Sequence, residues 1–191
     1  YKKSLFFKIN FSLEKIYKSI EIEWVMNFQF YIEKLSELDK CKEFQKAEPT
    51  AFPCSGFFIF DYDGKNDQQH IDFYLKDKNK MVSFKLESGE LVPLEYMGTA
   101  APSEIDLELD LDFDAVRELI EKRMVEEKAA KSMKKVIFSL QRKDNQHFLL
   151  GTVFFGVFGL VKTTICVEEM KIINFEKMNL MDLIKIKKKD D

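Results

Sequence analysis

The chain of 191 residues is long enough for one or two domains, and its 46% hydrophobic and 33% charged residues are typical of a globular protein rather than a disordered one. The formal net charge is −3, with cations and anions interspersed, which excludes a broad basic field, so we expect no nucleic-acid partner. The predominance of Lys and Glu over Asn favours a thermophilic source.

Residues 1–19 are predicted to form an N-terminal extension, a strand followed by a helical turn or two. Their opening segment, "YKKSLFFKINF", has charges within its apolar stretch and no small-residue cleavage site, so we expect no signal peptide there. The chain does not begin with Met, which leaves a fragment of an anchored protein as an alternative. We therefore predict a cytoplasmic protein, with an extracytoplasmic domain as the alternative.

Two segments alternate apolar and polar residues in the same way. They are residues 20–28, "IEIEWVMNF", and residues 105–113, "IDLELDLDF". Alternation with a period of two predicts a half-buried strand in each case. Apolar residues also recur at helical spacing over residues 20–44, so one long helix remains an alternative for the first segment.

An amphipathic helix is expected after each of these segments, over residues 30–44 and 114–133, and Asp114 is a candidate N-cap for the second. Each helix is followed by apolar runs separated by polar turns. This pattern predicts four hairpins, at residues 57–75 and 80–94 after the first helix and at residues 136–153 and 160–175 after the second.

These correspondences predict an α+β fold made by tandem duplication of a β-α-β-β-β unit, with antiparallel sheets and helices packed on one face. The first unit spans residues 20–97 and the second spans residues 105–184. Residues 98–104 form the linker between them, and residues 185–191 form a basic tail.

Residues 114–175, a helix followed by "KVIFSLQRKDNQHFLLGTV" and "LVKTTICV", resemble the PepSY-like domains. In the first unit, "MVSFKLESGELVPLE" is similar to the closing hairpin of that family, whereas "VEEMKIINFE" in the second unit departs from it because it has no Gly. Tandem units of this kind also resemble the β-lactamase-inhibitor-protein architecture. The resemblance implies binding or inhibition of another protein, and it brings no catalytic residues to this chain.

No catalytic, cofactor-binding or metal site is expected. Asp106, Glu108, Asp110 and Asp112 would stand about 7 Å apart along a strand, too far for two of them to share a calcium ion, so we interpret them as a solvated acidic face. In "DYDGKND", residues 61–67, Gly does not stand at the sixth position that a calcium-binding EF-hand loop requires, and the segment is interpreted as a hairpin turn.

The two histidines, His70 and His147, are interpreted as strand-edge residues, because two His without fixed carboxylates do not make a metal site. The glycines of "GTVFFGVFG" are not followed by the GK[ST] sequence of a phosphate-binding loop. No nucleophile elbow is present either. We therefore expect that the protein is not an enzyme and needs no cofactor.

The chain has three cysteines, Cys41, Cys54 and Cys166, and no two of them form a CxxC motif. This excludes a disulfide framework or a zinc site and favours a reducing compartment. Cys41 and Cys54 flank the loop "KEFQKAEPTAFP", so a bond between them is an alternative to two buried free thiols.

The most apolar segment is residues 148–167, "FLLGTVFFGVFGLVKTTICV". A membrane-spanning helix needs about 20 apolar residues, whereas the uncharged run ends at Lys162 and holds three Gly, so a hairpin is predicted. Both faces of this strand, and of "FFIFDY" at residues 57–62, are apolar, while the helix of one unit covers only one face.

The function predicted from these features is a non-catalytic protein-binding or regulatory module that uses an apolar sheet face. Its partner would be a second copy in a homodimer or another protein. The predicted partner-binding residues are Phe148, Leu150, Phe154, Phe155 and Phe158. The alternative is a carrier of a small apolar ligand, with a pocket between sheet and helices lined by Phe28, Phe58, Phe60, Phe73 and Phe84.

Overall fold

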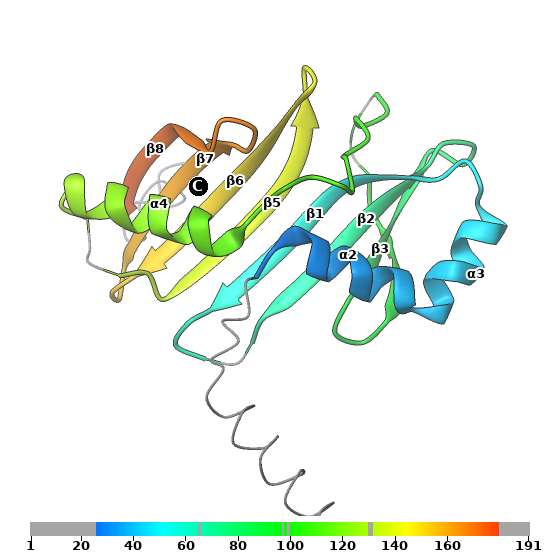
Figure 1. The fold of residues 1–191 in the computed structure, drawn as a ribbon, viewed down its shortest axis with the longest axis horizontal. Helices are drawn as coiled ribbons and strands as arrows, with labels where there is room; N and C mark the ends of the chain where they lie inside the picture. Colours follow the sequence, from blue (N-terminus) through cyan, green and yellow to red (C-terminus); the bar gives the residue numbers. More distant parts are fainter. Residues whose placement is uncertain (1–25, 65, 97, 99, 130–131, 180–191) are drawn as a thin grey trace, which may run out of the picture.

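The protein is an α+β structure built on one antiparallel sheet of eight strands (Figure 1). The structure, a computed structural model, describes residues 26–179 apart from residues 65, 97, 99 and 130–131. In chain order its elements are α2 (Phe28–Glu37), α3 (Asp39–Ala47), β1 (Phe52–Asp61), β2 (Gln68–Leu75), β3 (Lys80–Lys85), β4 (Glu90–Leu94), α4 (Phe113–Glu126), β5 (Lys135–Lys143), β6 (Gln146–Phe155), β7 (Gly159–Cys166) and β8 (Lys171–Asn179).

The strands lie in the order β4-β3-β2-β1-β5-β6-β7-β8, so β1 and β5 meet at the centre and β4 and β8 form the edges. Each of the four predicted hairpins is confirmed, since β1 pairs with β2, β3 with β4, β5 with β6, and β7 with β8, all antiparallel. Asp144 and Asn145 join β5 to β6 with φ of 49° and 64°. Positive φ at both central residues defines a type I′ turn, the connection that matches the twist of a hairpin.

The helices pack on one face of the sheet, with α4 lying across β5 to β8 and α2 and α3 covering β1 to β3 (Figure 1). Side chains on this covered face alternate with those on the opposite face along the strands, except at the register shifts in β1 and β8. Phe58 and Phe60 of β1 and Phe138 of β5 are at most 1% exposed on the covered face. Phe113, the first residue of α4, lies over them, with ring centroids 4.7 Å from Phe58 and 5.0 Å from Phe60. The core therefore centres on the strand pair β1 and β5.

The starts of α2 and α4 are tied to each other. Asp112 is the N-cap of α4 and accepts hydrogen bonds from the backbone N–H groups of Asp114 and Ala115, at 2.8 and 3.2 Å. The prediction that Asp114 is the cap is wrong, because its carboxylate instead accepts from the backbone N–H of Met26 at 3.0 Å. Phe28 N–H donates to Leu111 O and Phe113 N–H donates to Met26 O, so the two helix entries share a short bridge.

The predicted fold class is wrong. The chain forms a single sheet rather than two β-α-β-β-β units, and residues 105–111 do not belong to any strand. The predicted strand at residues 20–28 lies mostly outside the described residues, and Phe28 begins α2. The alternative of one helix through residue 44 agrees better with the structure, although Leu38 interrupts it between α2 and α3.

Alternation misled the prediction for residues 105–113 because it reports burial and not strand pairing. Ile105 and Leu111 are 1% exposed and pack in the core, as they would in a strand. The backbone of the segment, however, makes hydrogen bonds to separate parts of the chain and not to one neighbouring strand. Ile105 N–H donates to Pro53 O, and the Gln29 side chain donates to Leu107 O at 2.8 Å. The segment is an extended crossover that covers the core without a neighbouring strand.

Candidate functional site: the outer face of the sheet

The face of the sheet opposite the helices, here called the outer face, carries an apolar patch at its centre. Register places Ile59 opposite Ile137, and places Ser139 between Phe57 and Leu150. These side chains alternate with the fully covered residues of β1, β5 and β6. We define the outer apolar patch as Phe57, Ile59, Ile137, Phe148, Leu150 and Phe154.

None of the described helices covers this patch, because α2, α3 and α4 all pack on the other face. Leu150 is 41% exposed, and the other five side chains are partly exposed. A hollow of about 310 Å³ lies beside Leu150 and extends over β7 and β8. Its outer-face lining is Ile137, Ser139, Leu150, Thr152, Lys162, Thr164, Asn174 and Glu176. The outer face thus combines apolar side chains with a shallow depression.

Opposite charges border the patch in cross-strand positions. Lys85 Nζ of β3 lies 3.6 Å from Glu90 Oε2 of β4. Asp61 of β1 lies opposite Lys135 of β5 in the register. Lys162 of β7 likewise lies opposite Glu176 of β8. An apolar centre with a polar, mixed-charge rim is the usual anatomy of a protein–protein interface.

The structure brings together three of the five predicted partner-binding residues. Phe148, Leu150 and Phe154 share the outer face of β6. Phe155 points to the other side, where it packs against the core and its ring lies under Gly159. Phe158 lies in the turn between β6 and β7 and is 50% exposed.

The sequence-based list omitted half of the patch. Phe57 and Ile59 of β1 and Ile137 of β5 join it only because β1 pairs with β5, a contact between segments far apart in the chain. A signal was present for β1, since both faces of residues 57–62 are apolar. No sequence feature identified β5 as the neighbour of that strand.

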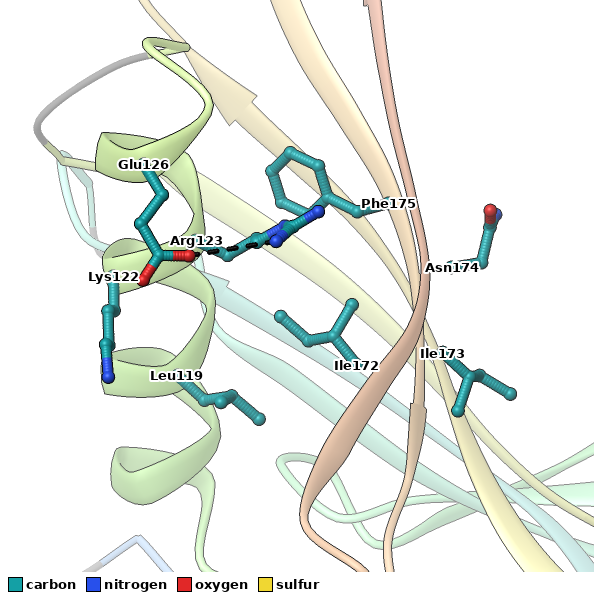
Figure 2. A pocket seen from close by; sticks show the side chains of 8 residues that line it. All are labelled: Leu119, Lys122, Arg123, Glu126, Ile172, Ile173, Asn174 and Phe175. Carbon is teal, nitrogen blue, oxygen red and sulfur yellow. Dashed lines mark ion pairs between the residues drawn. The ribbon is translucent and has the colours of Figure 1, made fainter.

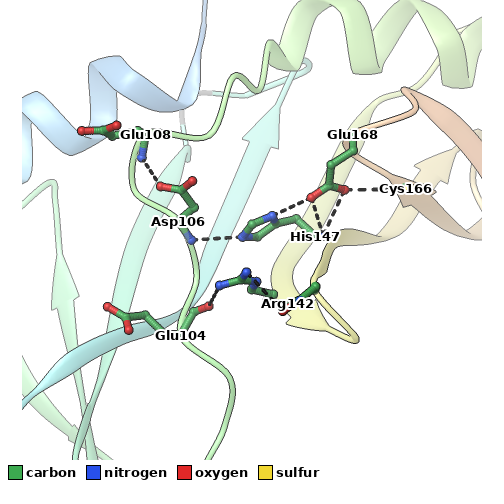
Figure 3. Close-up of polar contacts among 8 residues, drawn as sticks. Glu104, Asp106, Glu108, Arg142, His147, Cys166 and Glu168 are labelled. Atoms are coloured by element: carbon green, nitrogen blue, oxygen red, sulfur yellow. Dashed lines mark hydrogen bonds and ion pairs between the residues drawn. The ribbon is translucent and has the colours of Figure 1, made fainter.

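A polar cluster around His147 lies on the covered side of the sheet (Figure 3). The ring is 4% exposed, its Nε2 accepts from Asp106 N–H at 3.0 Å, and its Nδ1 lies 2.8 Å from Glu168 Oε1. Because Nε2 accepts a hydrogen bond, the proton of the neutral ring is on Nδ1 and is donated to Glu168. Both ring nitrogens are therefore engaged, and the cluster fixes the crossover at residues 105–108 to the sheet.

The contacts of Glu168 with His147 favour the ionised form of its carboxyl group. Burial by itself would raise the pKa of the Glu168 carboxyl, but hydrogen bonds from the His147 ring and backbone N–H outweigh burial and lower this pKa. The backbone bonds are 2.9 and 3.0 Å long. The arrangement holds a carboxylate in place and leaves the imidazole without a free lone pair for a metal ion or for proton transfer.

The described residues offer no group of three His, Cys, Asp or Glu side chains that could hold a metal ion. His70 lies on the outer face, where its ring centroid is 5.8 Å from that of Phe57, whereas His147 points to the covered side. The structure therefore does not bring the two histidines together.

The three cysteines are free and buried. The predicted free thiols at Cys41 and Cys54 are thus confirmed, and the alternative of a bond between them is wrong. Burial raises the pKa of the Cys54 thiol to about 12, with a smaller contribution from Asp72. Burial also raises the pKa of Cys41. Buried thiols with raised pKa values are poor nucleophiles and metal ligands.

A second hollow, of about 340 Å³, lies between α4 and the edge strand β8 (Figure 2). Leu119 of α4 and Ile172 and Phe175 of β8 line it. The Arg123 guanidinium lies 5.7 Å from the centroid of the Phe175 ring, and it pairs with Glu126 at 3.7 Å. Arg123 thus fills part of this hollow with a side chain that already has partners, and the outer face remains the stronger candidate.

The five phenylalanines of the predicted ligand pocket lie in the packed core. Each is at most 4% exposed. Their rings contact one another or neighbouring aromatic rings at ordinary stacking distances, for example 6.1 Å between Phe28 and Phe58 and 5.7 Å between Phe73 and Phe84. Side chains thus occupy the space that the carrier hypothesis assigned to a ligand.

Within the part of the chain that the structure describes, none of the helices has the length and apolar character needed to span a membrane. Residues 148–167, the segment that raised this question, form the hairpin of β6 and β7, as predicted.

No family model matches the chain, and no curated protein matches it. The crystal structure of a "putative lipoprotein" from Clostridium difficile 630 is similar, with a TM-score of 0.47 and 10% sequence identity over 73% of this chain and 91% of that chain. The resemblance to PepSY-like domains therefore stays a prediction.

Proposed function

We propose that the protein is a non-catalytic protein-binding or regulatory module that docks a protein on the outer apolar patch. The single observation that carries the proposal is a contiguous group of aromatic and aliphatic side chains on a sheet face that no described helix covers. Exposed apolar patches with polar rims are typical of interaction sites, because burying them on a partner removes apolar surface from water.

The packing of the rest of the molecule supports this proposal over a ligand carrier. The five aromatic rings expected to line a pocket are packed in the core. The His147 cluster has both ring nitrogens engaged, and the thiols of Cys41 and Cys54 have raised pKa values. A ligand carrier needs an open pocket, and an enzyme needs a reactive group such as a free imidazole or thiol. A protein-binding module needs neither. The buried free thiols also agree with the cytoplasm as the proposed compartment.

The test is to place a charge in the outer apolar patch. We expect Leu150→Lys to abolish retention of the protein partner, because an ammonium group in the centre of the contact would lose its hydration when the partner covers it. The measurement compares partners retained from cells of the source organism on immobilised wild type and on the variant, with folding checked by circular dichroism.

Val125→Lys is the matched control, because Val125 is 56% exposed on α4, on the covered side of the sheet. The control adds the same charge and should retain the partner. Equal retention on wild type and on Leu150→Lys would contradict the proposal.

A further inference from the structure

We infer that the protein which docks on the outer apolar patch is a second copy of this chain, packed face to face so that two sheets form a sandwich. The inference rests on the proposed function and adds the identity of the partner. Three features of the described residues support it: the edges of the sheet, the balance of charge on the outer face and the shape of that face.

The edges of the sheet oppose association strand to strand. The edge strand β4 has five residues and includes Pro93, which has no N–H to donate to an added strand. The other edge, β8, is irregular where Thr164 pairs with Asn174 and Ile165 with Ile172, which leaves Ile173 as an extra residue. Such a bulge, together with edge lysines, is a common protection against edge-to-edge pairing. Among the described residues, none gives the centre of the outer face a comparable protection.

The charge of the outer face suits a copy of itself. Its rim carries cations and anions in cross-strand positions, Lys85 with Glu90, Asp61 with Lys135 and Lys162 with Glu176. A face of one sign would repel its own copy, and it would instead select a partner of opposite sign. A balanced rim removes that repulsion and offers no net field to attract a strongly acidic or basic partner.

The shape of the face meets the requirement of a two-fold contact. In such a contact the same surface serves both copies, so it must supply projecting groups as well as the space that receives them. The outer face has aromatic rings at Phe57, Phe148 and Phe154 and a hollow of about 310 Å³ beside Leu150. Two sheets stacked in this way lie about 10 Å apart, with their strands within about 30° of each other.

The experiment is sedimentation velocity on purified full-length protein over a concentration series. We expect wild type and Val125→Lys to form dimers with the same dissociation constant. We expect Leu150→Lys to raise this constant at least ~30-fold, the effect of losing a central interface residue. Thr152→Lys, on the same face of β6, provides a second variant if Leu150→Lys does not fold.

Wild type that stays monomeric at about 1 mM overturns the inference. A dimer that Leu150→Lys and Thr152→Lys leave intact also overturns it, because the contact would then lie elsewhere. If wild type is monomeric while the retention of another protein still depends on Leu150, this inference fails and the proposed function stands.

Discussion

Replacing Phe113 with Ala is expected to lower the free energy of unfolding by about 3 to 5 kcal/mol. Phe113 is 2% exposed, and its ring contacts those of Tyr31, Phe58 and Phe60 at centroid distances of 6.0, 4.7 and 5.0 Å. It therefore joins α4 to α2 and to the central strand of the sheet. Truncation removes the apolar contacts that join α4, α2 and β1, and it leaves a cavity between these three elements. Urea unfolding followed by circular dichroism measures the change.

Phe158→Ala is the control for the loss of a phenyl ring. Phe158 is 50% exposed in the β6–β7 turn, so the same substitution should change the free energy of unfolding by at most about 0.5 kcal/mol. Similar losses in the two variants would mean that Phe113 does not occupy the centre of the core.

Replacing His147 with Ala is expected to lower the free energy of unfolding by about 2 to 4 kcal/mol at neutral pH. The substitution leaves the N–H of Asp106, which is in a partly buried hydrogen bond, without its acceptor, and it removes a hydrogen bond to the Glu168 carboxylate; each loss costs about 1 to 2 kcal/mol. The crossover at residues 105–108 should loosen with it. Hydrogen exchange at Asp106 and urea unfolding measure the two effects.

The same cluster gives a pH dependence that Glu168→Gln isolates. The pKa of Glu168 is lower in the folded protein than its ordinary value of 4.5, so its ionised form stabilises the fold. This stabilisation is complete above pH 4.5 and is lost as the pH falls through the lower, folded-state pKa. The difference in unfolding free energy between wild type and Glu168→Gln should therefore shrink on acidification. A difference that is constant from pH 7 to pH 3 would contradict this account of the cluster.

An outer face that binds its own copy would give the module a regulatory state without a further ligand. In the dimer the outer apolar patch would be occupied, so any other protein that uses the same patch would compete with the second copy. The concentration of the chain would then set the fraction of patches that are free.

The sequence by itself determined the local structure of this protein. The four hairpins follow from apolar runs separated by polar turns, and the type I′ turn at Asp144 and Asn145 shows the turn chemistry that such a pattern requires. The amphipathic pattern of residues 114–133 predicted the helix α4, and Ile120 within it is fully buried. Hairpins, turns and amphipathic helices are set by residues close together in the chain. Their positions can therefore be predicted from the local order of residues.

Only the tertiary structure decided how the pieces combine. Residues 105–113 alternate like a strand, yet residues 105–111 form a crossover and Phe113 begins α4, because burial of every second residue does not require a partner strand. Pairing of β1 with β5 joined all eight strands into one sheet and placed Ile59 beside Ile137, which created the outer apolar patch from distant segments. Such pairing depends on the free energy of the whole core, and periodicity within a segment does not specify it.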